Sequence, residues 1–100
     1  MTRYQYLKIP GYNNPVTIAY QVSTGPGDSS LLMTVGVAIC HEKDIFSKDF
    51  GRRIAEGRMN KSPHYVAFAN LDTSLSFGKR IVNSIHSWFN SSWKSLLQDP

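Results

Sequence analysis

The sequence predicts a small α+β domain, with a mainly antiparallel sheet of three to four strands and two helices packed on one face. Several short segments alternate apolar with small or polar residues, which is the two-residue period of a β-strand. Two longer segments repeat apolar residues at three- and four-residue spacings, the period of an amphipathic helix. With 100 residues, of which 41% are hydrophobic, the chain has the composition of a single folded domain over residues 1–100.

Four segments have the strand pattern, at residues 4–9, 16–24, 31–40 and 64–70. Within the second, Val16, Ile18, Tyr20 and Val22 share one side, which predicts a strand with one buried face. The third is apolar on both sides, so we expect a central strand with both faces covered. The loop GPGDSS between these two segments predicts that they pair antiparallel.

The first helix is predicted to start between Asp44 and Ser47, because both side chains accept hydrogen bonds from first-turn N–H groups. Inside this helix Gly51 and Gly57 each cost roughly 1 kcal/mol relative to alanine. Close approach of a neighbouring backbone or of a ligand would offset that cost. The predicted apolar face consists of Phe46, Phe50, Ile54, Ala55 and Met59.

The second helix is expected to begin with a cap at residues 72–74. Apolar residues at helical spacing predict a packing face that runs to Phe89. Two serines and Trp93 follow shortly after, and there the pattern no longer indicates where the helix ends.

Charge and composition restrict the partners. The chain carries 11 Lys and Arg against 7 Asp and Glu, a net charge of +4 that favours anionic partners. Mean hydropathy is -0.29, and no apolar run approaches the roughly 18 residues that cross a bilayer. The single Cys40 excludes an internal disulfide and a cysteine-based zinc cage. With no secretion signal in the first residues, we expect a cytoplasmic protein without a membrane partner.

Catalytic and metal-binding patterns are weak. Cys40 stands beside His41, but neighbours on a strand point to opposite faces, so a thiol–imidazole pair would not meet. The three histidines lack the spacing of a metal site. The sequence therefore predicts a protein that is not an enzyme and that holds no metal or cofactor.

Basic and aromatic residues on the two helices predict an anion-binding site. Guanidinium groups fork onto phosphate oxygens, and glycine lets a ligand approach backbone N–H groups. Aromatic rings would stack on a base, and a basic pair on the second helix would complete the site across a subunit contact. The competing interpretation places the phenylalanines in the core and the arginines on a solvated, ion-paired face. The candidate ligand-binding residues are Phe46, Phe50, Arg52, Arg53, Arg58, Lys79 and Arg80.

Residues 35–58, VGVAICHEKDIFSKDFGRRIAEGR, resemble the phage-encoded anti-Thoeris proteins that sequester cyclic ADP-ribose signals. The similarity lies in the apolar strand, the D-x-F sequence and the G-R-x-I-A-x-G-R sequence. It implies a non-enzymatic homo-oligomer that buries cyclic ADP-ribose isomers between protomers, with cyclic oligonucleotides as a second ligand class. By this resemblance Phe46, Arg52, Arg53 and Arg58 contact the ligand through stacking and phosphate binding.

We therefore expect a phage-type anti-defence protein that sequesters a cyclic nucleotide immune signal without cleaving it, in the host cytoplasm if it is phage-encoded. A small basic nucleic-acid-binding protein also fits the net charge and the aromatic residues. A protein–protein inhibitor of a host factor, anchored by Trp88 and Trp93, is a further alternative. An enzyme that acts on a nucleotide through Asp44 or His41 fits least well.

Overall fold

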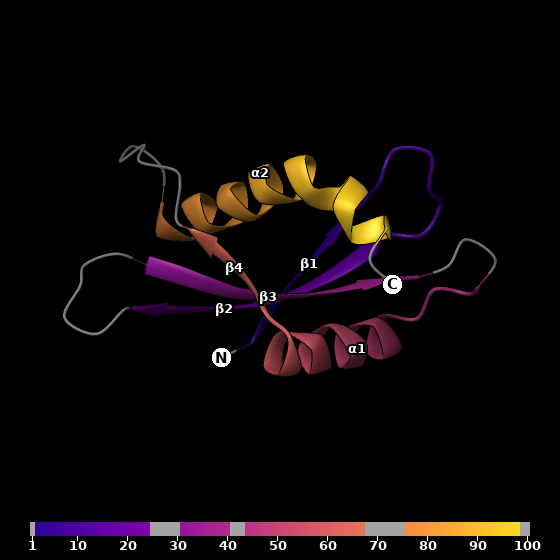
Figure 1. The fold of residues 1–100 in the computed structure, drawn as a ribbon, viewed down its shortest axis with the longest axis horizontal. Coiled ribbons are helices and arrows are strands. Elements are labelled where there is room, and N and C mark those ends of the chain that lie inside the picture. The colour runs from indigo at the N-terminus through magenta and orange to yellow at the C-terminus, as the bar shows by residue number, and fades with distance from the viewer. Residues whose placement is uncertain (1, 25–30, 41–43, 68–75, 99–100) are drawn as a thin grey trace.

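A computed structural model describes residues 2–24, 31–40, 44–67 and 76–98. The strands form one antiparallel sheet in the order β1-β2-β3-β4 (Figure 1). The predicted α+β class, the antiparallel pairing of the second and third strands and the central place of the third are confirmed. The elements are β1 (Arg3–Leu7), β2 (Val16–Thr24), β3 (Leu31–Ile39), α1 (Lys48–Lys61), β4 (His64–Ala67) and α2 (Phe77–Gln98).

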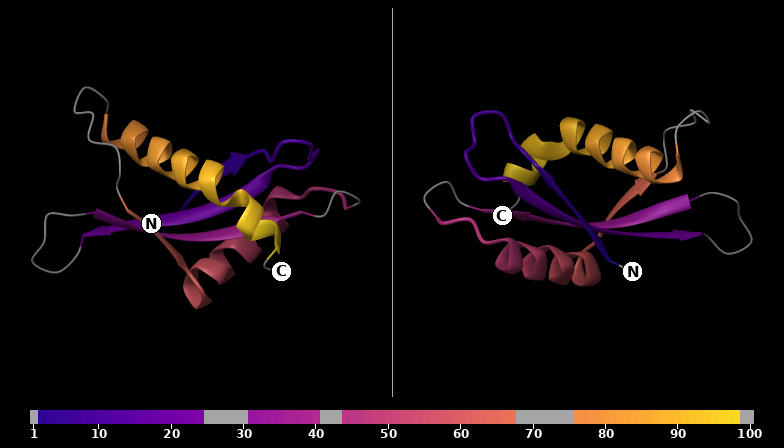
Figure 2. Two further views of the ribbon diagram at one scale, coloured as in Figure 1. Left: turned by 45° about the horizontal axis from the view of Figure 1, so that its top comes forward. Right: turned by 180° about the vertical axis from the view of Figure 1, so that it is seen from behind.

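The two helices lie on opposite faces of the sheet, so the prediction that both pack on one face is wrong (Figures 1 and 2). Side chains alternate between the faces of a strand, and on β2 and β3 the two sets differ in size. The larger side chains face α2. The smaller ones, among them Ala19 and Ala38, form a separate cluster with Ala55 and Met59 of α1.

The larger core lies between the sheet and α2. Helix α2 buries Ile81, Ile85 and Phe89 there, which confirms the predicted packing face. The helix begins after Ser76, whose Oγ accepts a hydrogen bond from the Lys79 N–H at 3.3 Å, and the caps predicted at residues 72–74 lie outside the described residues. The buried residues of this core are Leu7, Ile9, Val16, Ile18, Tyr20, Met33, Val35, Val37, Val66, Ile81, Ile85 and Phe89.

On the other face, α1 lies directly against the backbone of β3. A Cβ atom added at Gly36 would overlap the backbone atoms of Ala55 and Met59. Gly51 of α1 makes a similar approach to β2, because a Cβ there would lie 2.6 Å from the Oγ1 atom of Thr17. The expected close approach at Gly51 is therefore present, and its neighbour is the Thr17 side chain. Gly57 has no atom within 4 Å of an added Cβ, among the residues described.

The start and the buried side of α1 differ in part from the prediction. Ser47 caps the helix by accepting the Phe50 N–H at 3.4 Å. Ala55 and Met59 are buried as expected. Phe50 is 62% exposed, so placing it on the packing face was wrong. The helix packs on the sheet through Gly51, Ala55 and Met59, and the Phe50 ring lies outside that contact.

The close contact at Gly36 gives a stability prediction. Replacing Gly36 with alanine drives a methyl group into the backbone of α1, and we expect a loss of about 1–3 kcal/mol in the free energy of unfolding. The matched control is Gly57→Ala, which adds the same methyl group where space is open and is expected to stabilise the helix by about 0.5–1 kcal/mol. Urea unfolding of the two variants measures both effects, and equal stability of the two variants would contradict the packing described here.

Candidate functional site

The three arginines predicted to bind a ligand do not converge. Successive residues of an α-helix point about 100° apart, so Arg52, Arg53 and Arg58 leave α1 in different directions. Arg52 reaches β1, where its Nε donates to the Tyr6 hydroxyl at 2.6 Å. Arg58 reaches β3, where one terminal nitrogen donates to the Val37 carbonyl at 2.8 Å. Arg53 is exposed. Only Arg58 lines the hollows described below.

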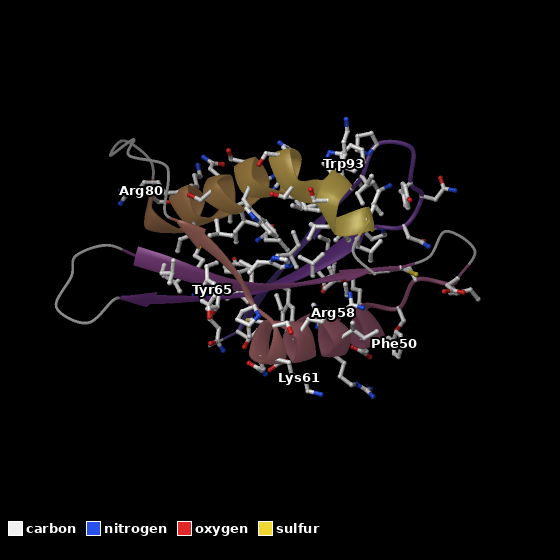
Figure 3. The ribbon with its side chains drawn as sticks, viewed as in Figure 1. Phe50, Arg58, Lys61, Tyr65, Arg80 and Trp93 are labelled. Carbon is white, nitrogen blue, oxygen red and sulfur yellow. The ribbon has the colours of Figure 1, made fainter. Side chains whose placement is uncertain are left out.

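Lys79 and Arg80 lie on the first turn of α2, across the sheet from α1. Figure 3 shows Arg80 near one end of the molecule, while Phe50 and Arg58 lie toward the other. Lys79 is exposed and Arg80 is half-buried. These two residues therefore cannot join the α1 residues in a site within one subunit, and their role across a subunit contact stays a prediction.

Phe46, Phe50 and Arg58 share a hollow of about 220 Å³, which we call the aromatic hollow. It lies between the ends of β2 and β3, the segment before α1, and α1 itself. Phe46 is half-buried with its ring edge-on to Tyr6, at 6.4 Å between ring centroids. The lining is mainly apolar and consists of Thr17, Ala38, Ile39, Cys40, Asp44, Ile45, Phe46, Ser47, Phe50, Gly51, Ile54 and Arg58.

Hydrogen bonds hold the segment that walls the aromatic hollow. Asn14 donates its side-chain amide to the Asp44 carbonyl at 3.1 Å and contacts the Cys40 sulfur at 3.5 Å. The Cys40 thiol also lies 3.9 Å from the same Asp44 carbonyl. Together with the Ser47 cap of α1, the Asn14 bond holds residues 44–47 in place beside the hollow. Cys40 thus belongs to the scaffold of the hollow.

Thr17 adds an unusual polar group to this lining. The residue is fully buried, and its Oγ1 atom has no hydrogen-bond partner within the part of the chain that the structure describes. A buried hydroxyl without a partner lacks the stabilisation that water or a protein acceptor provides. Its Oγ1 lies against the Gly51 backbone, so this close contact between α1 and β2 leaves the hydroxyl unsatisfied.

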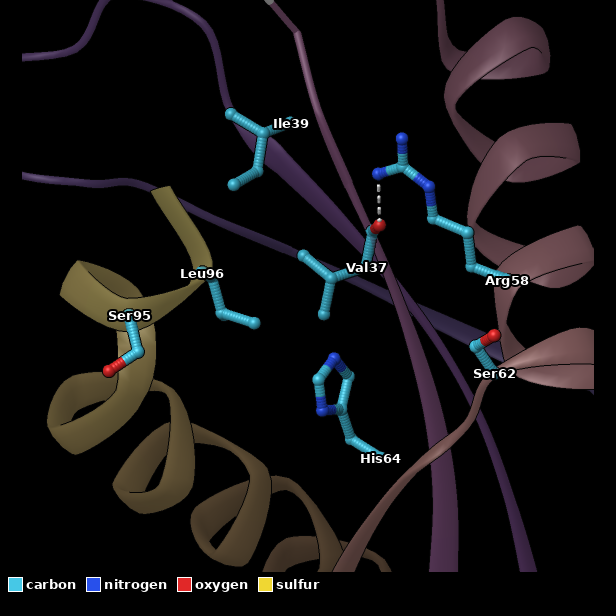
Figure 4. Close-up of a pocket in the computed structure, with 7 residues that line it drawn as sticks. All are labelled: Val37, Ile39, Arg58, Ser62, His64, Ser95 and Leu96. Carbon is cyan, nitrogen blue, oxygen red and sulfur yellow. Dashed lines mark hydrogen bonds between the residues drawn. The ribbon is translucent and has the colours of Figure 1, made fainter. Parts of the chain in front are cut away.

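A second hollow, of about 440 Å³, lies along the edge of β3 and is called here the edge hollow (Figure 4). Strand β4 pairs with β3 only from Leu32 to Val35, so no described strand covers that edge from Gly36 onward. Arg58 donates a hydrogen bond to the Val37 carbonyl there. The hollow is lined by Val37, Ile39, Arg58, Ser62, His64, Ser95 and Leu96.

A cationic and aromatic cluster occupies the opposite flank of α1, beside β1. The Arg52 guanidinium lies 5.2 Å from the Tyr4 ring centroid and 5.9 Å from that of Tyr6, and the Lys48 ammonium lies 5.3 Å from the Tyr6 ring centroid. The Tyr4 hydroxyl donates to Glu56 at 2.9 Å, and this bond raises the pKa of Tyr4 above its ordinary value. The Tyr6 hydrogen bond likewise raises the pKa of Arg52.

Sequence reasoning missed several residues of these surfaces. Tyr4 and Tyr6 alternate with polar residues on β1, and this two-residue period places both rings on one face of the sheet. The sequence alone therefore indicates that the two rings lie close together. Gly36 within an apolar strand is likewise a signal of close backbone approach. His64 and Thr17 carried no such signal, because their surroundings come from elements distant in the chain. Trp88 and Trp93 pack against the larger core.

Comparison with protein-family models, curated proteins and solved structures finds no match. Within the described residues, no helix has the length and apolar character that crossing a membrane requires. In the same part of the chain, no cluster of three or more His, Cys, Asp and Glu side chains is arranged to hold a metal ion. His41 lies outside the described residues.

Because the Thr17 hydroxyl has no hydrogen-bond partner among the described residues, its removal should not destabilise the protein. In Thr17→Val the buried polar atom is replaced by a methyl group, which removes a desolvation penalty of about 1–3 kcal/mol, offset in part by tighter packing on Gly51. We expect the free energy of unfolding without ligand to be unchanged or to rise by about 1 kcal/mol. Thr17→Ser keeps the hydroxyl and loses only a methyl group, and it should be destabilised. Chemical unfolding measures both, and a clear loss of stability in Thr17→Val would contradict the prediction.

The Tyr4–Glu56 bond predicts a pH dependence. Because the folded state raises the pKa of Tyr4 above 10.0, stability from this bond is fully present below that pH and is lost as pH rises through the folded-state pKa. Glu56→Ala removes the acceptor and should lower the pKa of Tyr4. Tyrosinate absorbance measured against pH, with Tyr4→Phe to identify the Tyr4 component among five tyrosines, checks this. An unchanged Tyr4 titration in Glu56→Ala would contradict it.

Proposed function

We propose that this protein binds and sequesters a nucleotide signal of the cyclic ADP-ribose type without cleaving it. The observation that carries the proposal is the aromatic hollow, where apolar and aromatic side chains stand beside one arginine. A nucleotide needs both, because its base stacks on aromatic faces while its phosphate takes charge-assisted hydrogen bonds. The resemblance of residues 35–58 to anti-Thoeris proteins supports the same ligand class.

The geometry supports different roles for the two phenylalanines. Phe50 is largely exposed at the rim of the hollow, so its ring is available to a base at little cost to the folded structure. Phe46 is half-buried against Tyr6, which holds its ring in place. Phe50 is therefore proposed as the stacking platform and Phe46 as a fixed wall of the site. Packing in the core does not explain the presence of a phenylalanine at position 50, because its ring is largely exposed.

Arg58 is proposed as the phosphate-binding residue. A guanidinium carries five N–H donors, and the bond to Val37 orients the group while leaving donors for an anion. Arg52 is already held by Tyr6, and Arg53 lines neither hollow. The proposal thus reduces the three arginines implied by the resemblance to one direct contact.

A homo-oligomer is part of the proposal. Ile45 is 95% exposed and stands beside Phe50 in the lining of the aromatic hollow. Apolar side chains left in water at the rim of a binding site favour burial by a second surface. A second copy placed over these residues would close the hollow around a ligand, as the resemblance implies.

The test compares two arginine variants with the same change of charge. Arg58→Ala should weaken binding of cyclic ADP-ribose at least tenfold, because the phosphate loses its charged partner, whereas Arg53→Ala on the exposed side should change it less than twofold. Phe50→Ala should also weaken binding and leave folding unchanged. Calorimetric titration gives the affinities, and circular dichroism confirms the fold of each variant.

A release assay tests sequestration itself. The protein is mixed with cyclic ADP-ribose isomers and removed by filtration, and free ligand is measured before and after heat denaturation. Recovery of intact ligand supports the proposal. A new product would make the protein an enzyme, and no loss of ligand at protein excess would overturn the proposal.

A second candidate function is binding of single-stranded nucleic acid by the cluster of Tyr4, Tyr6, Lys48 and Arg52. Aromatic rings beside cationic groups on an exposed surface are the features that bind such strands. This function predicts an affinity for oligonucleotides that falls steeply with salt and depends on Arg52. The aromatic hollow has no part in it, so Phe50→Ala separates the two functions.

A further inference from the structure

A third hollow, of about 580 Å³, lies between the N-terminal half of α2 and strands β1 and β2, and is called here the α2 hollow. Helix α2 runs obliquely across this face of the sheet, which is the face opposite α1 (Figure 2). The α2 hollow shares no lining residue with the aromatic hollow or the edge hollow. It is therefore a separate place at which a ligand can bind.

The floor of the α2 hollow is apolar. Tyr20 and Ile81 are buried, with 4% and 8% of their surfaces exposed, and Val22 and Val82 are half-buried beside them. Three of these four side chains are aliphatic. Because the two valines keep part of their surface in water, an apolar group of a ligand that covers them gains from the hydrophobic effect.

Two polar side chains, Arg3 and Gln5, line the same hollow from β1. Arg3 pairs with Tyr20, which belongs to the larger core, so Arg3 lies on the face of the sheet toward α2. Gln5 follows two residues later on that face. A guanidinium presents paired N–H donors that match the two oxygens of a carboxylate, and an amide donates a further hydrogen bond. The hollow thus combines an aliphatic floor with donors for one carboxylate.

The charges around the α2 hollow also favour an anion. The backbone dipoles of a helix give its N-terminus a partial positive charge, and α2 has no acidic residue in its first turn. Lys79, predicted from the sequence to bind a ligand, lines a smaller hollow of about 210 Å³. The two hollows adjoin, because Gly78 and Val82 line both. None of the residues that line either hollow is acidic.

We propose that the α2 hollow binds an alkyl monocarboxylate of medium chain length. The carboxylate lies on Arg3 with a further hydrogen bond from Gln5, and the alkyl chain covers Val22, Ile81 and Val82. The volume of about 580 Å³ is within the range of about 300–1,000 Å³ that small-molecule sites usually have. This site is independent of the proposed function, because the two use different residues on opposite faces of the sheet.

Two glycines provide a matched pair of variants. A Cβ atom added at Gly78 has no described atom within 4 Å, and Gly78 lines the α2 hollow, so a larger side chain there takes up space that the ligand needs. Gly57 of α1 has equally open surroundings and lines none of the four hollows. Leucine has a higher helix propensity than glycine, so neither replacement should destabilise its helix.

The experiment measures binding of hexanoate, octanoate and decanoate by calorimetric titration, below the concentrations at which they form micelles. The wild-type protein should bind one equivalent, with an affinity that rises about two- to fourfold for each added CH₂ group. Gly78→Leu should weaken decanoate binding at least tenfold, whereas Gly57→Leu should change it less than twofold. Arg3→Gln should weaken it at least fivefold, and Arg53→Gln, with the same change of charge at an exposed position, less than twofold.

Octylammonium has the same number of carbon atoms as octanoate and the opposite charge, so it should bind at least fivefold more weakly. Equal binding of these two probes, or no saturable binding of decanoate, would overturn the inference. Equal effects of the two leucine variants, with circular dichroism showing both folded, would overturn it as well. Binding of cyclic ADP-ribose, measured in parallel, should be unchanged in Gly78→Leu, so failure of this inference is distinguished from failure of the proposed function.

Discussion

The structure depends on the contact between the backbone of α1 and the backbone of β3 at Gly36. Because no side chain stands between them, the helix lies closer to the sheet than bulky residues would allow. The contact explains why β2 and β3 carry only Thr17, Ala19, Gly36 and Ala38 beneath α1, while their face toward α2 carries the large side chains. The sheet is therefore covered by a closely packed helix, α1, on one face and by the larger apolar core with α2 on the other.

The same contact positions the candidate site. With α1 lying directly on β2 and β3, Gly51 lies against Thr17 and Arg58 reaches the edge of β3. Phe50 passes beyond the packed surface and remains exposed. A helix farther from the sheet would bring Phe50 inward and take Arg58 away from the Val37 carbonyl. The aromatic hollow is therefore a consequence of close packing next to a segment that has large side chains.

Strand periods and helix periods were sufficient to predict the elements of this fold, because each is a local property of consecutive residues. The segment 16–24 was predicted to the residue. The face of the sheet that each helix covers was not, although Gly36, Ala19 and Ala38 are small enough to indicate a second close layer. The apolar stripe of α1 includes Phe50, which lies outside the core, so the stripe does not indicate which face of the sheet the helix covers. The edge hollow is harder still to predict from the sequence, because its lining residues come from β3, β4 and both helices.

Arg58 links the requirements of the fold to those of the proposed site. An uncovered strand edge leaves backbone carbonyls without partners, and such edges need protection from pairing with other chains. The guanidinium satisfies one of these carbonyls and is itself held in one orientation by the bond. A ligand that binds an already oriented guanidinium loses less conformational entropy than one that must order a free side chain. The short β4 strand therefore has two effects: it leaves the Val37 carbonyl to be bonded by Arg58, and it leaves the space beside Arg58 in which a ligand can lie.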